Sequence, residues 1–211
     1  VYSSGGIKVR DGFSIDEQES ILLERGRAFA ESTAKSNVEF CEEQNISLKK
    51  GWDVPAARKR LSAISDLRDI VKTISYRPFD DRKILFDESV VWTTARSTMD
   101  HMLRGANFAL VSARSEKSGT CSHFFMSQSL VETKCGERTT QSAVFPLYLY
   151  PAEDEFEQAR RVNFDPKLYA KIQKLATHAQ HGTPDEMAVF DYIYGVLHSP
   201  DYRRTFAEFL K

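Results

Sequence analysis

The chain has 211 residues, with 29 basic and 30 acidic side chains and a formal net charge of −1. Hydrophobic residues make up 41% of it and charged residues 28%, which excludes a collagen-like, low-complexity or wholly disordered protein. The balanced charge excludes a global attraction to nucleic acid or to anionic membranes, so any such attraction must be local. The longest apolar stretch, residues 143–151, is too short to span a bilayer.

The cysteines indicate a reducing compartment. Cys41, Cys121 and Cys135 are widely spaced and form neither a CxxC pair nor a zinc-type cluster with the histidines. The chain starts at Val1, and its opening residues lack the apolar core and cleavage site of a secretory signal. We therefore expect an intracellular, cytoplasmic protein, and we expect this sequence to be a fragment of a longer chain.

Basic residues are concentrated in the middle of the sequence. Residues 49–114 hold 13 basic and 8 acidic groups, a net charge of +5, whereas residues 1–48 carry −4 and residues 151–211 carry −2. Five aromatic residues are interleaved with these cations: Trp52, Tyr76, Phe79, Phe86 and Trp92. An anionic ligand is expected to dock on this stretch.

Helices are predicted before residue 73. After a glycine-bounded strand or loop at residues 3–13, Ser14 and Glu17 form a capping box that predicts a helix to about Ala34. A polar stretch at residues 42–51 separates it from a second helix. That helix is predicted over residues 53–71, with Pro55 in its first turn and apolar residues at helical spacing.

Strands are predicted next, and helices again at the end. Clusters of β-branched and aromatic residues predict five strands, at residues 84–86, 90–94, 108–112, 123–131 and 143–150, with a short helix at residues 97–103. Cap residues predict three later helices, which start at Asp165, at Thr183 with Glu186, and at Ser199. The order predicts one α+β domain, with a central mixed or antiparallel sheet flanked by N-terminal and C-terminal helices.

Catalytic motifs are missing from the sequence. It has no glycine-rich cofactor loop, no Asn/Asp-Pro-Pro motif of an adenine methyltransferase and no P-loop. Asp80 lies in a segment distantly like that of a metal-dependent nuclease, but the expected second carboxylate is missing. His178 with His181, and Cys121 with His123, lack the partners that a metal site or a nucleophile needs. We expect a binding module with no catalytic residue and no metal.

Four segments, in order, resemble one family. They are Gly6-Ile7-Lys8-Val9-Arg10-Asp11, Tyr76-Arg77-Pro78-Phe79-Asp80 with Arg82, Phe145-Pro146-Leu147-Tyr148-Leu149-Tyr150-Pro151, and Asp191-Tyr192-Ile193-Tyr194-Gly195-Val196-Leu197-His198-Ser199-Pro200-Asp201-Tyr202-Arg203. Together they resemble the C-terminal target recognition, or specificity, domain of single-polypeptide type ISP and type IIG restriction-modification enzymes. Val9 is a departure, because the family tends to have Thr or Asn there.

The resemblance implies a function. The chain would read a double-stranded DNA target for an N6-adenine DNA methyltransferase in a bacterial or archaeal cytoplasm, without a membrane. Residues 1–48 would join a covalently linked methyltransferase domain, residues 49–151 would form the recognition core, and residues 152–211 a C-terminal helical subdomain. Catalysis, S-adenosylmethionine binding and base flipping would belong to the methyltransferase part, and a restriction endonuclease could be joined to it in the parent chain. This fragment itself would be catalytically inert and hold no cofactor.

The motif residues have two possible roles. Tyr76 to Asp80 form either a turn fixed by an ion pair or a surface from which Arg77, Arg82 or Lys83 reaches DNA. The residues expected to build the scaffold are Tyr76, Pro78, Phe79, Asp80, Phe145, Pro146, Tyr148, Tyr150, Tyr192, Tyr194, His198, Ser199, Pro200, Tyr202 and Arg203. The DNA-contacting candidates, most of them in the loop segments 93–104, 112–120 and 134–141, are Arg77, Arg82, Lys83, Arg96, Arg104, Arg114, Lys117, Lys134 and Arg138. A protein-docking module and a metal-dependent nuclease remain as alternatives.

Overall fold

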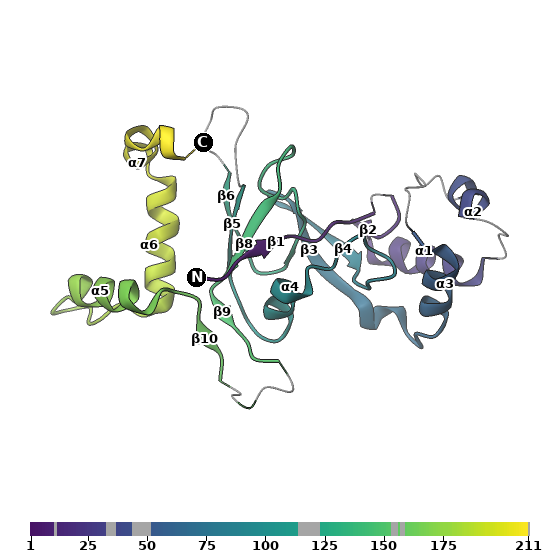
Figure 1. The fold of residues 1–211 in the computed structure, drawn as a ribbon, viewed down its shortest axis with the longest axis horizontal. Helices are drawn as coiled ribbons and strands as arrows, with labels where there is room; N and C mark the ends of the chain where they lie inside the picture. The colour runs from purple at the N-terminus through teal and green to yellow at the C-terminus, as the bar shows by residue number, and fades with distance from the viewer. Residues whose placement is uncertain are drawn as a thin grey trace. The chain divides into compact units, whose positions relative to one another are not determined.

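The computed structural model describes residues 1–10, 12–32, 37–43, 52–113, 123–152, 156 and 159–210 (Figure 1). The chain divides into two compact units. We call Ile7–Thr94 the hairpin unit, and Val1–Gly6 with Ala95–Lys211 the sheet unit. Helices and antiparallel strand pairs occur in both units, so the predicted α+β class is confirmed.

The hairpin unit is a β-hairpin packed against helices. Its elements are β2 (Ile15–Asp16), α1 (Glu19–Glu31), α2 (Asn37–Glu43), α3 (Val54–Ser62), the 3-10 helix η1 (Leu67–Ile70), β3 (Val71–Arg77) and β4 (Asp80–Leu85). β4 lies between β2 and β3 and pairs antiparallel with both. α1 packs against α3 and β4, so the helices cover the end of the hairpin opposite its turn.

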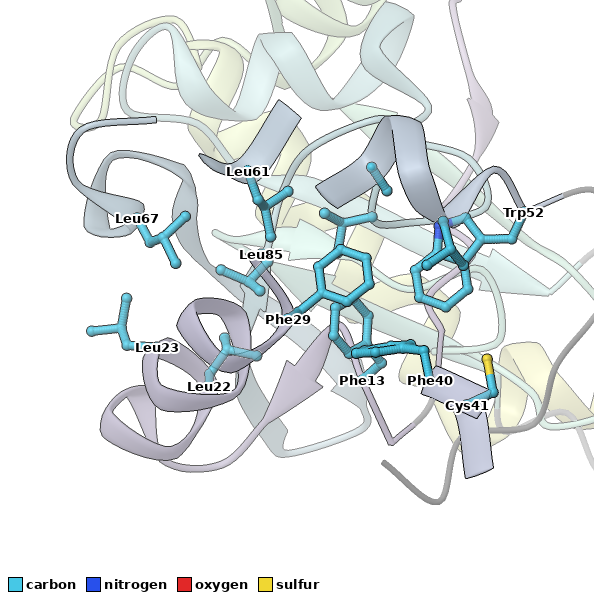
Figure 2. Packing of buried hydrophobic residues seen from close by; sticks show 13 residues of the cluster. Phe13, Leu22, Leu23, Phe29, Phe40, Cys41, Trp52, Leu61, Leu67 and Leu85 are labelled. Carbon is cyan, nitrogen blue, oxygen red and sulfur yellow. The ribbon is translucent and has the colours of Figure 1, made fainter. Parts of the chain in front are cut away.

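Aromatic rings fill the core of this unit (Figure 2). The Phe29 ring stacks on Trp52 with 5.6 Å between centroids, and it meets Phe13 and Phe40 edge-on at 4.8 and 4.6 Å. Leu85 brings β4 into the same cluster. Burying these large rings together is what holds the helices and the hairpin in one unit.

Three N-terminal predictions are wrong in detail. The first helix starts at Glu19, because the buried Ser14 hydroxyl accepts from the Arg10 backbone amide at 2.8 Å and caps no helix. The second helix ends at Ser62, since the β-branched segment from Val71 pairs with β4 instead. Residues 90–94 form no strand, because the Val90 and Val91 amides donate to the Asp87 carbonyl in a turn, and Thr93 then makes an isolated bridge with Lys8.

The sheet unit has a sheet ordered β1-β8-β5-β6 and a helical C-terminal part (Figure 1). Its strands are β1 (Ser4–Gly5), β5 (Ala109–Ala113), β6 (Phe124–Ser127), β7 (Leu130–Val131), β8 (Ser142–Pro146), β9 (Tyr148–Leu149) and β10 (Arg161–Val162). Its helices are α4 (Arg96–Leu103), α5 (Pro166–Ala176), α6 (Glu186–His198), α7 (Pro200–Thr205) and the 3-10 helix η2 (Ala207–Phe209). α4 packs against β1, β7 and β8, and β9 pairs with β10.

The cap residues place the C-terminal helices nearly as predicted. The Asp165 carboxylate accepts from two backbone amides at the start of α5, and the Ser199 hydroxyl accepts from the Tyr202 amide in α7. α6 is capped by Asp185 rather than by Thr183. None of the helices that the structure describes is long and apolar enough to cross a membrane.

Candidate nucleic-acid interface

The turn of the β3–β4 hairpin consists of Pro78 and Phe79. Arg77 and Asp80 pair across it, which closes the hairpin. Proline fixes the φ angle that the first turn position needs. Phe79 has a φ of 61°, a left-handed conformation in which glycine or asparagine is favoured, and its side chain is fully exposed. The turn therefore presents one large ring at its tip.

Cations stack and pair directly behind this tip. The guanidinium carbons of Arg77 and Arg82 lie 3.8 and 4.3 Å from the centroid of the Tyr76 ring. Arg82 also donates to Asp80, and these hydrogen bonds hold the pKa of Asp80 below its ordinary value and raise the pKa of Arg82. Lys83 donates to a threonine hydroxyl of β3, 3.1 Å away. The expected ion-paired turn is thus present, with Arg82 as the partner, while contact with DNA stays a prediction.

A hollow of about 290 Å³ beside Arg82 is ill suited to phosphate. It is lined by the carboxylates of Asp16 and Glu17, and Asp16 pairs with Arg25 at 2.6 Å. The Glu17 carboxylate also approaches Arg82, at 3.7 Å. Because carboxylates repel a phosphate, this hollow is a poor place for one.

Arg10, from the first motif, is a scaffold residue that the sequence did not single out. Its guanidinium carbon lies 3.4 Å from the centroid of Trp92 and 4.3 Å from that of Trp52, and the residue is 8% exposed. Burial lowers its pKa to about 10. Trp52 and Trp92 were singled out among the interleaved aromatics, but only the fold brings them to one arginine.

Two candidate arginines of the sheet unit share one carboxylate on α4. Arg96 and Arg104 lie four residues before and after Asp100, at 3.4 and 3.5 Å from its oxygens. Arg104 also donates to the carbonyl of Pro151 at 3.0 Å, which ties α4 to the end of β9. Both arginines are exposed, and this pairing fixes where their guanidinium groups can point.

A pocket of about 330 Å³ lies beside Arg104 in the same unit. Arg161 and Tyr150 also line it, together with His101, whose Nδ1 accepts from the Tyr150 backbone amide at 3.1 Å. Burial and, secondly, the charge of Arg104 lower the pKa of His101. The pocket therefore offers two cations and a neutral imidazole at neutral pH.

The loop between β7 and β8 presents Lys134 and Arg138, both exposed. The Glu137 carboxylate accepts from the backbone amides of Thr139 and Thr140, each at 2.7 Å, and these bonds with that from the Thr139 hydroxyl lower the pKa of Glu137. A serine hydroxyl at the start of β8 accepts from the Gly136 amide at 2.8 Å. The loop is thus held in shape by its own short side chains, and its two long cations point to solvent. Two further candidates, Arg114 and Lys117, lie outside the described residues.

The third motif lies in the sheet unit, and its tyrosine hydroxyls are hydrogen-bonded. Tyr148 is buried and donates its hydroxyl to the Glu186 carboxylate at 3.1 Å. The Tyr150 hydroxyl donates to the carbonyl of Ala106 at 2.7 Å. Both tyrosines therefore have hydrogen-bonded hydroxyls, and neighbouring Phe145 and Pro146 belong to β8.

The fourth motif joins α6 to α7. His198 Nδ1 lies 2.9 Å from the Tyr194 carbonyl oxygen in the last turn of α6, and Arg203 Nε donates to the Leu197 carbonyl at 2.6 Å. Tyr202, on α7, packs on the ring of Phe206. Tyr192, one of the residues expected to build the scaffold, is 67% exposed and borders a hollow that Leu175 of α5 also lines.

In the part of the chain that the structure describes, the side chains of the proposed nuclease and histidine sites have other partners. The Asp80 carboxylate is engaged by Arg82, and no group of three or more metal-ligating side chains occurs among the residues that the structure describes. His178 and His181 stack with ring centroids 5.1 Å apart, and His178 accepts from the Gln180 amide. Cys121 lies outside the described residues.

Solved structures share this fold at low sequence identity. A DrdV–DNA complex aligns with a TM-score of 0.67 and 20% identity, over 98% of this chain and 20% of that one. The ATP-dependent Type ISP restriction-modification enzyme LlaBIII bound to DNA aligns with a TM-score of 0.67 and 16% identity, over 99% of this chain and 14% of that one. A nuclease-deletion mutant of the Type ISP restriction-modification enzyme LlaGI in complex with a DNA substrate mimic aligns with a TM-score of 0.59 and 17% identity, over 100% of this chain and 16% of that one.

The chain thus spans a fifth or less of the length of these solved relatives. No curated protein matches the sequence. A family model, described as the Type ISP C-terminal specificity domain, matches residues 1–211. The chain belongs to the family of Type ISP C-terminal specificity domains.

Proposed function

We propose that this chain recognises the double-stranded DNA target of a restriction-modification enzyme. The observation that carries the proposal is the family match over all 211 residues. The shared fold of three enzymes solved with DNA or a DNA mimic supports it. So does the placement of exposed cations on short, well-fixed turns, where readout residues are usually found.

The two units offer different kinds of contact. In the hairpin unit, half-buried Arg77 stacks on Tyr76 and donates to the Tyr76 carbonyl directly before the exposed turn, and its proposed role is contact with a phosphate. In the sheet unit, Lys134 and Arg138 extend from a loop that is hydrogen-bonded within itself. A loop fixed in this way loses little conformational entropy on binding, and this favours specific contact with base edges or phosphates.

The catalytic steps are proposed to belong to the rest of the parent enzyme. The parent is proposed to be an N6-adenine DNA methyltransferase that binds S-adenosylmethionine and flips the target base outside this chain, with restriction endonuclease activity as a further proposal for the parent. The chain itself is proposed to be catalytically inert and to act in a bacterial or archaeal cytoplasm. A plasmid-nicking assay with magnesium tests the nuclease alternative, which predicts nicking that Asp80→Ala abolishes.

A salt series tests DNA recognition directly. Fluorescence anisotropy is measured with a random-sequence duplex pool at rising salt, for the wild type and for a Lys134→Ala/Arg138→Ala double variant. The slope of the logarithm of the binding constant against the logarithm of the salt concentration should fall by about 1 for each lost phosphate contact. The dissociation constant for non-specific DNA is expected at about 10⁻⁴ to 10⁻⁶ M. A Lys171→Ala/Lys174→Ala variant is the matched control, since it removes the same charge from exposed positions of α5.

The alternative of a protein-docking module predicts a different result. If the affinity for duplex DNA does not change with salt, or if a folded sample does not bind duplex DNA at low salt, DNA recognition by this chain is contradicted. An equal loss of slope in both double variants shows attraction by total charge alone, and the proposed role of the β7–β8 loop is then wrong.

A further inference from the structure

Phe79 combines an exposed ring with an unfavourable backbone. Its side chain is fully exposed, so burial gives the ring no stabilisation in this chain. Its φ of 61° costs a residue with a Cβ about 1 kcal/mol or more relative to glycine. Phe156 and Phe209 are also largely exposed, but neither is among the described non-glycine residues with positive φ. The Phe79 ring is therefore accessible to a partner molecule at the tip of the turn.

The backbone around Phe79 is fixed from both sides. Pro78 restricts the turn before it, and the Arg77–Asp80 pair closes the ladder beneath it. The Asp80 carboxylate is held by two nitrogens of Arg82. A ring on a turn held in this way can contact a partner with less loss of conformational entropy than a ring on a flexible loop.

The charges near the ring fit a polyanion whose interior is apolar. Residues 77–83 hold three basic and two acidic side chains, and one of the acids, Asp80, is paired with Arg82. Arg77 lies immediately before the turn and is half-buried, with its guanidinium stacked on Tyr76 and donating to the Tyr76 carbonyl. Duplex DNA has this combination of chemistry, since phosphates flank a stack of flat bases.

We propose that Phe79 is a wedge that inserts between stacked base pairs of the bound DNA, with Arg77 placed against the neighbouring phosphates. The inference rests on the proposed function, DNA recognition, and adds how the duplex is deformed. Apolar side chains inserted between base steps unstack and kink the duplex, most easily at pyrimidine–purine steps. The hairpin thereby contributes to target choice through the deformability of one step, without hydrogen bonds to base edges.

The substitution that tests the wedge also suits the turn. Asparagine tolerates the left-handed conformation, so Phe79→Asn removes the ring and relieves the strain. Its melting temperature should equal or exceed that of the wild type. Phe79→Trp keeps a large aromatic ring at the tip, and Phe209→Asn is the matched control that removes an exposed phenylalanine from η2.

The experiment measures unwinding of DNA and binding in parallel. A closed circular plasmid is relaxed by a topoisomerase with the full 211-residue chain at saturation, and the shift in linking number is read on a gel after the protein is removed. Anisotropy with a random-sequence duplex pool gives the affinity. The wild type, Phe79→Trp and Phe209→Asn should shift the linking number alike, whereas Phe79→Asn should lose most of the shift and bind about 5-fold or more weakly.

The outcomes separate the wedge from DNA recognition itself. If the wild type binds with a steep salt dependence but leaves the linking number unchanged, or if Phe79→Asn unwinds as well as the wild type, the wedge is wrong and DNA recognition stands. If the folded wild type does not bind duplex DNA at low salt, both proposals are wrong.

Discussion

Arg82 donates two hydrogen bonds to the Asp80 carboxylate, from Nε to Oδ1 at 2.9 Å and from Nη2 to Oδ2 at 2.8 Å. The pair stands on β4 directly after the turn that carries Phe79, and Arg82 at the same time stacks on Tyr76. A bidentate contact of this kind fixes the orientation of both planar groups. The pair therefore sets the shape of the hairpin tip, and the geometry of the tip should depend on pH.

Acid should weaken the Asp80–Arg82 ion pair, and the coupling free energy between the two residues should fall as Asp80 is protonated. Arg82 lowers the pKa of Asp80 below its ordinary value of 3.8 in the folded state. The stabilisation is thus fully present above pH 3.8 and is lost as the pH falls through the lower folded value. A double-mutant cycle of Asp80→Asn and Arg82→Ala by denaturant unfolding should give a coupling of about 1 kcal/mol or less at pH 7, because both groups are partly exposed. A coupling that persists unchanged at low pH contradicts the ion pair.

A methyl group at Gly6 should damage the sheet unit, whereas one at Gly5 should not. A Cβ on Gly6 would lie 2.6 Å from the Val131 carbonyl oxygen and 2.8 Å from Glu132 backbone atoms, which cannot move aside cheaply. A Cβ on Gly5 would meet only the Ser142 carbonyl oxygen, at 3.9 Å. Gly6→Ala should therefore reduce the free energy of unfolding by about 1–3 kcal/mol. Gly5→Ala is the adjacent control, and equal effects of the two changes in denaturant unfolding would overturn the steric explanation.

Removal of the central ring should destabilise the hairpin unit most. Phe29 is fully buried and touches the rings of Phe13, Phe40 and Trp52 (Figure 2). Phe29→Ala leaves a cavity that the stacked neighbours cannot close, so the free energy of unfolding should fall by about 3–5 kcal/mol. Phe29→Leu, which keeps much of the volume, should lose clearly less. Similar losses for the two variants in denaturant unfolding would show that the site collapses on truncation.

Local signals predicted three helix starts correctly, but they predicted the hairpin poorly. Asp53, Asp165 and Ser199 cap helices because their side chains reach amides only two or three residues away, a relation visible in the sequence. The hairpin was missed in part because β3 pairs with β4 through a register shift, which breaks the alternation that marks a strand. β-propensity depends on such partners more than helix capping does.

In the candidate site, too, contacts between residues close in sequence were predicted and contacts between distant residues were missed. The motif that contains Arg82 and Asp80 was predicted because its members lie two residues apart. The cage around Arg10 was not, since its two tryptophans come from positions more than 40 residues downstream that only the fold unites. Tyr192 was expected to build the scaffold but is 67% exposed, because the apolar character of α6 alone does not say which face is covered.

His101 should stay neutral at pH 7 as the Nε2–H tautomer. Its Nδ1 accepts the Tyr150 backbone amide at 3.1 Å, which leaves the proton on Nε2, and burial lowers its pKa below the ordinary 6.5. Because the unfolded chain then binds the proton more tightly, this residue should reduce stability as the pH falls below 6.5. Nitrogen NMR of the folded chain should show the Nε2–H tautomer at pH 7 and protonation only at lower pH than for a free histidine. A cationic ring at pH 7 would mean that the Tyr150 amide does not donate to it, and the pocket would then carry three positive charges beside Arg104 and Arg161 rather than two.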